Sequence, residues 1–496
     1  MLPRTLFALN RTLLNRHNLT IAPNKGKKVQ STDFSSLNLS KALISNLSSL
    51  GYQEMTPVQA QSLPLILDGK DVVAQGKTGS GKTAAFGLGL LHNLEVKKFR
   101  VQSLVLCPTR ELADQVAKEI RKLARAIHNV KVLTLCGGVP LGPQIGSLEH
   151  GAHIIVGTPG RIEDHLNRGR LNLDNLNTLI LDESDRMLEM GFQSALDLIF
   201  SLCPAHRQTL LFSATFPDQI KPITKKIMSN PEIVKVESTH DTNTINQYFF
   251  QVNDHQQRMI ALRLLLLKYQ PESSVIFCTT KVETQKVADE LSSFGFSCMA
   301  LHGDLEQKDR DRTLVMFANK SISILVATDV AARGLDIDQL DAVINYQVSR
   351  DPEIHLHRIG RTGRAGSKGV ALTLIAENEI HRVIKLEDYL KQSIKIQELP
   401  SNSYLDKKMK KPSMVTLQID GGKKQKLRPG DILGALTAKN KNSNKSDISG
   451  DQIGKIQIFD LKAYVAVSRK IADAALKKLV NGRLKGKTFK ARYIRN

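Results

Sequence analysis

The chain has 496 residues, of which 41% are hydrophobic, and a formal net charge of +22. This length predicts about three domains, each with enough apolar residues for a core of its own. No apolar run approaches the ~18 residues of a membrane span, and the five scattered cysteines form neither a metal-ligand pair nor a disulfide framework. The composition therefore excludes membrane-spanning and disulfide-stabilised proteins and predicts small buried cysteines in a reducing compartment.

The first 32 residues have a distinctive composition. Residues 1–32 contain six Lys and Arg but no Asp or Glu. This resembles an organellar transit peptide, although a disordered basic arm, or a start codon assigned too far upstream, explains it equally well. We expect residues 1–32 to be a disordered basic extension.

A phosphate-binding loop follows the first predicted strand, at 71–74. It fits the pattern G-x-x-x-x-G-K-[ST], and its residues are Gly76, Lys77, Thr78, Gly79, Ser80, Gly81, Lys82 and Thr83. A strand before the loop and a helix-compatible run after it, at 84–88, aim backbone N–H groups and a helix N-terminus at phosphate oxygens. We expect Lys82 to supply a charge to the phosphates and Thr83 a hydroxyl to a metal ion.

Two carboxylates, Asp182 and Glu183, end an apolar run later in the chain. Alone, such a pair would more often be a solvated strand end, and the loop alone would sometimes be a plain turn. Together they predict a Mg²⁺ ligand, a water-activating base and the hydrolysis of a nucleoside triphosphate such as ATP.

Short apolar strands recur through the middle of the chain, each followed by a polar or glycine-containing cluster. They lie at 104–106, 154–156, 179–181 and 210–212 in the first half, and at 275–277, 299–301, 324–327 and 342–344 in the second. Helix-compatible segments separate them, which predicts two parallel, doubly wound α/β sheets with ligand groups at the carboxyl ends of the strands. We place the two domains at 33–237 and 238–395.

The second predicted domain lacks a phosphate loop but has Arg361 and Arg364 in a glycine-rich turn. Two arginines three residues apart suit an arginine finger, which supplies charge to a phosphoryl group from another domain. Most such turns are solvated basic loops, but one nucleotide loop for two sheets favours the finger. We therefore predict one ATP cleft between two lobes, assembled when they close.

The end of the chain concentrates the positive charge, since residues 404–496 hold 23 Lys and Arg against 7 Asp and Glu. Such a field favours a polyanion, and with a nucleotide site upstream the natural partner is nucleic acid. After a linker at 396–412, residues 413–496 predict the βαββαβ order of an RNA-recognition motif, an α+β fold. Tyr464 is nearly alone as a sheet aromatic, so basic loop residues are the better RNA-binding candidates: Lys423, Lys424, Arg428 and Lys487.

Residues from about 34 to 395 resemble the DEAD-box ATP-dependent RNA helicases, because a dozen motifs of that family occur in order. The resemblance implies two tandem RecA-like domains that use ATP and Mg²⁺. It implies that Phe34 stacks on adenine, that Gln59 pairs with the adenine edge and that Asp336 contacts the ribose. It also assigns the catalytic roles: Lys82 to phosphate, Thr83 and Asp182 to the metal, Glu183 to water, and Arg361 and Arg364 to the γ-phosphate.

The same resemblance implies a surface that grips RNA without reading its sequence, because arginines, hydroxyls and glycine amides contact phosphate and sugar. Its residues would be Arg110, Gly138, Thr158, Arg161, Thr279, Gln307, Arg310 and Thr328. Hydrolysis and RNA grip would be coupled through Asp185, Ser213, Thr215 and His357. Ser184 departs from the alanine of the family, but the two carboxylates are unchanged, so we expect ATPase activity to persist.

The C-terminal segment resembles the RNA-binding domain of bacterial DbpA-type helicases in the sequences D-G-G-K-K, R-P-G-D-I-L-G-A-L and G-K-T. The likeness implies binding to a hairpin of 23S ribosomal RNA and remodelling of the pre-50S particle during assembly of the large subunit. We expect a cytoplasmic monomer without membrane contact. The residues leave two alternatives open, a DNA helicase and an ATP-gated RNA clamp that does not unwind.

Overall fold

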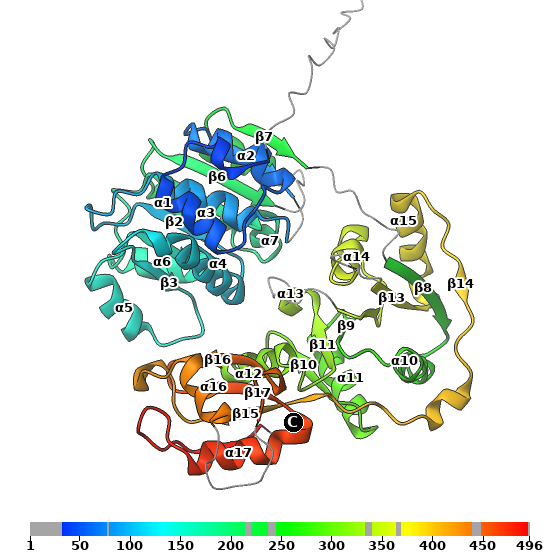
Figure 1. Cartoon of the computed structure of the whole chain (residues 1–496). Coiled ribbons are helices and arrows are strands. Elements are labelled where there is room, and N and C mark those ends of the chain that lie inside the picture. Colours follow the sequence, from blue (N-terminus) through cyan, green and yellow to red (C-terminus); the bar gives the residue numbers. More distant parts are fainter. Residues whose placement is uncertain are drawn as a thin grey trace, which may run out of the picture.

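The computed structural model describes residues 32–76, 79–213, 220–236, 245–332, 340–363, 369–438 and 448–494. Within these residues the chain forms two α/β lobes and a smaller C-terminal α+β domain (Figure 1). The predicted boundary between the lobes falls at residues 237–244, outside the described residues.

Lobe 1 is built on a parallel sheet with strand order β3-β4-β2-β5-β6-β1-β7. Its strands are β1 (Val72–Gln75), β2 (Ser103–Leu106), β3 (Val132–Leu135), β4 (Ile154–Gly157), β5 (Thr178–Asp182), β6 (Gln208–Ser213) and β7 (Glu232–Lys235). Its helices are α1 (Lys41–Ser49), α2 (Pro57–Leu67), α3 (Lys82–His92), α4 (Arg110–Leu123), α5 (Leu141–Glu149), α6 (Pro159–Asn167), α7 (Ser184–Glu189), α8 (Gln193–Ser201) and α9 (Ile220–Ile227). Every residue of β2, β4, β5 and β6 is buried, as expected for parallel strands covered by helices on both faces.

Lobe 2 repeats this architecture with strand order β10-β11-β9-β12-β13-β8-β14. Its strands are β8 (Ile245–Val252), β9 (Ser274–Cys278), β10 (Cys298–Leu301), β11 (Ile324–Thr328), β12 (Ala342–Asn345), β13 (Gly369–Ala376) and β14 (Ile396–Gln397). Its helices are α10 (His255–Tyr269), α11 (Lys281–Ser293), α12 (Gln307–Ala318), α13 (Asp329–Ala332), α14 (Pro352–Ile359) and α15 (Ile380–Leu390). The prediction of two parallel α/β sheets is confirmed.

The segment predicted as a linker, 396–412, is attached to lobe 2 along much of its length. Ile396 and Gln397 pair in parallel with β8, and Leu399, Tyr404, Leu405 and Met409 pack against the core of lobe 2. The predicted linker therefore extends the edge of the lobe 2 sheet and covers part of its core.

The C-terminal domain has the predicted order β15 (Met414–Ile419), α16 (Pro429–Thr437), β16 (Ile453–Ile458), β17 (Ala463–Ser468), α17 (Ala472–Asn481) and β18 (Ala491–Tyr493). Its antiparallel sheet has the order β16-β17-β15-β18. Alternate residues of β15 and β17, such as Leu417 and Val465, form the core under the two helices. The intervening residues, such as Thr416 and Tyr464, face the opposite side.

That opposite face of the sheet lies against lobe 2, near α12 (Figure 1). The Thr416 hydroxyl oxygen accepts a hydrogen bond from Asn319 Nδ2 at 3.1 Å and lies 2.6 Å from Ser321 Oγ. All three residues are buried, and Ile494 packs against the apolar cluster of lobe 2 that contains Phe317. The face that usually binds RNA in RNA-recognition motifs is therefore an interdomain contact in this chain.

Candidate active site and RNA-binding surfaces

The phosphate loop connects β1 to α3 and closes around its own lysine. Lys82 begins α3 and is 7% exposed, and its Nζ donates a hydrogen bond to the Gly76 carbonyl oxygen at 2.7 Å. The ammonium group therefore lies inside the loop, where phosphate oxygens would lie. Gly81 caps the helix at a φ of 92°, and a Cβ at this position would lie 2.4 Å from Gln59 Nε2. Only glycine satisfies both conditions.

Asp182 and Glu183 lie buried at the carboxyl end of β5. Burial raises the pKa of Asp182 to about 7, an effect that the Lys82 cation opposes and the Glu183 carboxylate increases. Among the described residues, Asp182 Oδ1 and Glu183 Oε2 accept no hydrogen bond, and the Glu183 oxygen has only an ion pair with Arg186 at 3.4 Å. Buried carboxylate oxygens left in this state beside a lysine suit a divalent cation shared with phosphate. With the Thr83 hydroxyl on α3, these residues fit Mg²⁺.

Gln59 and Phe34, the residues predicted to recognise adenine, are both buried. Gln59 Oε1 accepts a hydrogen bond from the Thr56 N–H at 2.9 Å, and its Nε2 donates to the Gly81 carbonyl oxygen at 3.0 Å. The carboxamide therefore ties the start of α2 to the phosphate loop. Phe34 is 3% exposed and packs edge-on to Tyr52 with a centroid distance of 6.2 Å. Stacking on adenine requires this ring to become exposed, which its sequence position did not indicate.

Arg186 on α7 connects the carboxylates of lobe 1 to lobe 2. Its Nε lies 3.4 Å from Glu183 Oε2, and its Nη2 lies 3.5 Å from His357 Nδ1 on α14. The arginine is 4% exposed. Sequence reasoning named His357 but missed Arg186, because only the approach of the lobes distinguishes this arginine from the many others in the chain.

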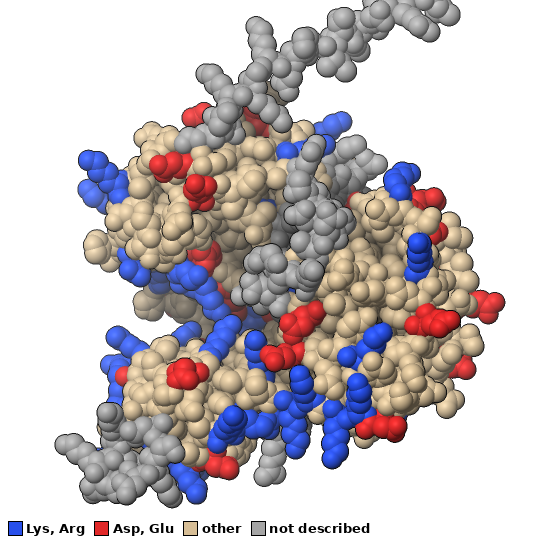
Figure 2. Space-filling model, turned by 45° about the vertical axis from the view of Figure 1, so that its right-hand side comes forward, with Lys and Arg blue, Asp and Glu red and all other residues tan. Residues whose placement is uncertain are grey.

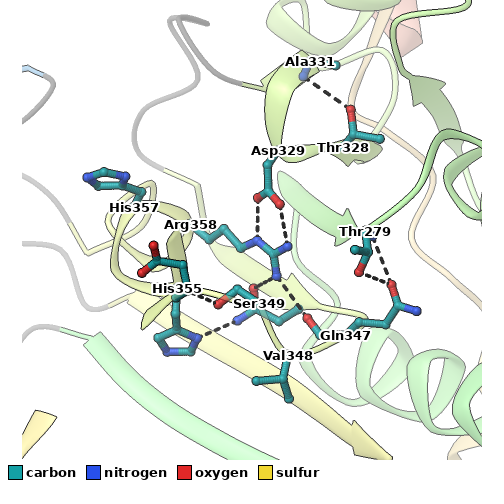
Figure 3. A network of polar contacts seen from close by, with 12 residues as sticks. Thr279, Thr328, Asp329, Ala331, Gln347, Val348, Ser349, His355, His357 and Arg358 are labelled. Atoms are coloured by element: carbon teal, nitrogen blue, oxygen red, sulfur yellow. Dashed lines mark hydrogen bonds and ion pairs between the residues drawn. The ribbon is translucent and has the colours of Figure 1, made fainter. Parts of the chain in front are cut away.

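A second missed arginine, Arg358, organises the lobe 2 side of the cleft (Figure 3). Its Nε and Nη2 donate to the two carboxylate oxygens of Asp329 at 2.6 and 2.8 Å. Its Nη1 donates to Asn345 Oδ1 at 3.1 Å and to the Gln347 carbonyl oxygen at 3.0 Å. Arg358 is 2% exposed and follows His357 on α14, three residues before Arg361. These four hydrogen bonds, which we call the Arg358 fork, therefore fix helix α14, and α14 leads to the predicted arginine finger Arg361.

In lobe 1, the arginines predicted to bind RNA hold one loop. Arg110 Nη1 lies 3.4 Å from the Gly138 carbonyl oxygen, and Arg161 donates to the Val139 carbonyl oxygen at 3.3 Å and to Gln144 Oε1 at 3.1 Å. Thr158 is the residue before α6, which begins at Pro159. The predicted residues Arg110, Gly138, Thr158 and Arg161 therefore come together at the carboxyl end of the sheet.

In lobe 2, the predicted RNA-binding residue Arg310 pairs with lobe 1. Its Nη2 lies 2.9 Å from Glu111 Oε1, and Gln307 Nε2 lies 3.5 Å from the same oxygen. The two lobes therefore also meet on the predicted RNA side. Thr279 donates its N–H to Gln347 Oε1 at 3.0 Å, and the Thr328 hydroxyl accepts from the Ala331 N–H at 3.4 Å.

Three family profiles match this chain in order. They are the DEAD/DEAH box helicase at residues 56–223, the helicase conserved C-terminal domain at 256–366 and the DbpA RNA binding domain at 416–493. The chain is 51% identical over 465 residues to the ATP-dependent RNA helicase DbpA of Escherichia coli. The matched region covers 94% of this chain and the whole of that protein. The chain belongs to the DbpA-type DEAD-box ATP-dependent RNA helicases.

Other DEAD-box relatives match about three quarters of the chain. The helicase CshA of Geobacillus kaustophilus is 44% identical over 371 residues, with 75% of this chain and 79% of that protein covered. The solved structure of Saccharomyces cerevisiae Dbp5 bound to RNA and ADP BeF3 superposes with a TM-score of 0.66 and 29% identity, covering 75% of this chain and 96% of that one. In addition to the helicase core, this chain has the DbpA-type RNA-binding domain at residues 416–493.

Several predicted residues of this DbpA-type helicase lie outside the described residues. They are Lys77, Thr78, Thr215, Asp336 and Arg364. Their roles stay predictions, as do those of the described residues. Ser213 ends β6 beside the phosphate loop, where its carbonyl oxygen accepts the Gly76 N–H at 3.0 Å. No helix among the described residues is both long and apolar enough to cross a membrane.

The DbpA-type domain presents its predicted RNA-binding lysines to solvent. Lys423, Lys424, Arg428 and Lys487 are all exposed. Figure 2 shows Lys and Arg side chains on both sides of the hollow between lobe 1 and the C-terminal domain. Lys485, close to Lys487 in sequence, donates to the Lys426 carbonyl oxygen at 2.9 Å. This bond ties its turn to the loop that carries Lys423 and Lys424.

Proposed function

We propose that this helicase remodels 23S ribosomal RNA during assembly of the large ribosomal subunit, and that the C-terminal domain delivers the core to its site. Two observations support ribosomal RNA as the target: the match to the DbpA RNA binding domain and the positive charge concentrated in residues 404–496. The core would open nearby duplexes locally, because its phosphate and sugar contacts hold a strand without requiring sequence. Monomeric, cytoplasmic action stays a prediction.

The cleft residues have separable roles in ATP hydrolysis under this proposal. Lys82 holds the β- and γ-phosphates, and Thr83 and Asp182 hold Mg²⁺, which when bound would neutralise phosphate charge. Glu183 orients and deprotonates the attacking water, since it is buried next to Asp182 and restrained by Arg186. Arg361 and Arg364 approach from lobe 2 and stabilise the charge of the transition state.

Coupling to RNA follows from where the lobes meet. One interlobe contact joins Arg186 to His357 beside the ATP cleft, and another joins Glu111 to Arg310 on the RNA side. Both depend on how closely the lobes approach. A strand that spans the lobes would hold them together, and ATP in the cleft would do the same, so each ligand favours binding of the other.

The observation that carries the proposal is the single chain that joins the two helicase domains to a DbpA-type domain. It is tested by measuring ATPase rate without RNA and with homopolymer RNA, large-subunit ribosomal RNA or DNA. We expect the ribosomal RNA to stimulate most strongly and DNA not at all. A variant ending at residue 412 keeps the strand and the apolar residues that pack on lobe 2, and it should lose the preference for ribosomal RNA. If homopolymer RNA and large-subunit ribosomal RNA stimulated the ATPase of the full chain equally, ribosomal RNA would not be its specific target.

A further inference from the structure

The turn between β16 and β17 exposes apolar side chains in basic surroundings. Phe459 is 37% exposed and Leu461 is 57% exposed. Asp460 and Lys462 complete the turn and are also exposed. The core of the C-terminal domain requires neither apolar side chain at this position, and neighbouring lysines make the turn a poor surface for self-association.

Backbone contacts hold the turn against the loop that carries Lys423 and Lys424. The Lys423 N–H donates to the Phe459 carbonyl oxygen at 2.8 Å, and the Lys424 N–H donates to the Asp460 carbonyl oxygen at 3.0 Å. A Cβ at Gly422 would lie 2.2 Å from the Phe459 carbonyl oxygen, so only glycine permits this approach. The backbone of two exposed lysines is thereby held against the backbone of the turn.

The Phe459 ring is supported but not enclosed. It packs edge-to-face with Tyr464, with centroids 5.5 Å apart and planes at 85°. Tyr464 is itself 9% exposed and is therefore not available to a base. A restrained ring loses little conformational freedom when it binds, which favours its use as a stacking platform.

The turn lies at the margin of the contact between the C-terminal domain and lobe 2. The interior of that sheet face is closed to RNA, because Thr416 is buried against Asn319 and Ser321. The adjoining helix α12 begins with Gln307 and continues through Arg310, both predicted to grip RNA in the core, and Asp311 of the same helix lies close enough to influence Tyr464 electrostatically. Tyr464, which supports the Phe459 ring, therefore lies near the helix that carries Gln307 and Arg310.

We propose that Phe459 stacks on an unpaired RNA base while Lys423, Lys424 and Lys462 contact the flanking phosphates. The ligand class is single-stranded RNA, because the turn combines an aromatic ring with cations on a rigid frame. This inference rests on the proposed function as an RNA helicase and deepens it by naming a site in the C-terminal domain. RNA-recognition motifs usually stack bases on the face of the sheet, whereas here the base would stack on the turn between β16 and β17.

Tryptophan fluorescence tests the site directly, because the chain contains no tryptophan. Phe459→Trp in the full-length protein introduces one fluorophore at the proposed stacking position. Val480→Trp is the matched control, since Val480 is 45% exposed on α17 of the same domain. Saturating large-subunit ribosomal RNA should quench the first variant and leave the second unchanged. Binding of the RNA without quenching of Phe459→Trp would overturn the proposal, and so would equal quenching of both variants.

A second measurement separates stacking from charge. Phe459→Ala should raise the concentration of ribosomal RNA that half-saturates ATPase stimulation by at least about fivefold, while Phe459→Trp restores tight binding. Replacing the three lysines with glutamine should reduce the slope of log affinity against log salt by about 2. Wild-type affinity in Phe459→Ala would refute stacking. If ribosomal RNA stimulates the ATPase of the wild type no better than homopolymer RNA does, the proposed ribosomal target is wrong. Quenching of Phe459→Trp fluorescence by either RNA would still support the stacking site. Quenching by a protein partner but by no RNA would assign the turn to protein binding and also refute the proposal.

Discussion

The Arg358 fork gives the sharpest prediction about lobe 2. Arg358→Met removes a guanidinium that donates to both carboxylate oxygens of Asp329, to the Asn345 side chain and to the Gln347 carbonyl oxygen. The arginine side chain is 2% exposed and that of Asp329 is 20% exposed, so the carboxylate keeps little compensating water. Breaking a buried pair by removing one partner costs about 3–5 kcal/mol. The substitution should therefore destabilise lobe 2 by about that amount.

The same variant should lose ATPase activity even where lobe 2 remains folded. Arg358 does not need to touch ATP for this effect, because it positions α14 and with it Arg361. Misplacement of a catalytic group by about 1 Å costs on the order of 10²-fold. We expect kcat to fall by about that factor in RNA-saturated assays, with a smaller change in the KM for ATP. Arg358→Lys should recover part of the stability, since it keeps the charge but not the fork.

Urea unfolding followed by hydrogen exchange in β11 and α14 measures the stability loss, and steady-state ATPase assays measure kcat. Arg382→Met is the matched control, because Arg382 is also in lobe 2 and its polar partners among the described residues are the Val348 carbonyl oxygen at 2.9 Å and Glu379 at 3.6 Å. If Arg358→Met were no less stable than this control and kept wild-type kcat, the fork would have no positioning role. Asp329→Asn in a double-mutant cycle should show coupling to Arg358.

Four further outcomes are expected. Burial and, to a smaller extent, the nearby Arg358 cation lower the pKa of His355 to about 3. His355 therefore stabilises the folded protein fully above its unfolded pKa of about 6.5, and this contribution is lost as the pH falls below that value. Between pH 6.5 and pH 5, the free energy of unfolding measured in urea should fall by about 1.5 kcal/mol more in the wild type than in His355→Gln. Ser184→Ala removes a buried hydroxyl that has no hydrogen-bond partner among the described residues, and it should raise the free energy of unfolding by about 1 kcal/mol with ATPase activity retained. Gly81→Ala should abolish nucleotide binding in a titration with fluorescent ATP, because its Cβ would collide with Gln59. Glu183→Gln should trap ATP and RNA together in a filter-binding assay, and normal turnover by this variant would contradict the role of Glu183.

The ATP site was largely predictable because its chemistry is local in sequence. The phosphate loop and the pair Asp182–Glu183 each combine a strand end with polar residues, and parallel strands bring such ends to one edge. Nine strands of the two sheets were predicted from short apolar runs, and five were not: β3, β7, β8, β13 and β14. Polar residues such as Asn246 and Gln247 interrupt the apolar pattern of β8, and β14 has only two residues.

Residues that act across elements could not be predicted in the same way. Arg186 and Arg358 acquire their roles from partners far away in sequence, His357 for one and Asp329 for the other. The burial of Phe34 also depends on packing that its motif does not encode. In the C-terminal domain, the scarcity of sheet aromatics did signal an unusual RNA surface, but the covering of that sheet by lobe 2 required the structure.

The central claim is that ATP and RNA jointly close the two lobes, and single-molecule fluorescence transfer tests it most directly. Dyes at the exposed positions 99 in lobe 1 and 282 in lobe 2 would report the distance in the Glu183→Gln variant with ATP, with RNA and with both. We expect a long-lived high-transfer state only when both ligands are present. The same transfer efficiency in all three conditions, or closure by ATP alone that RNA does not alter, would contradict it.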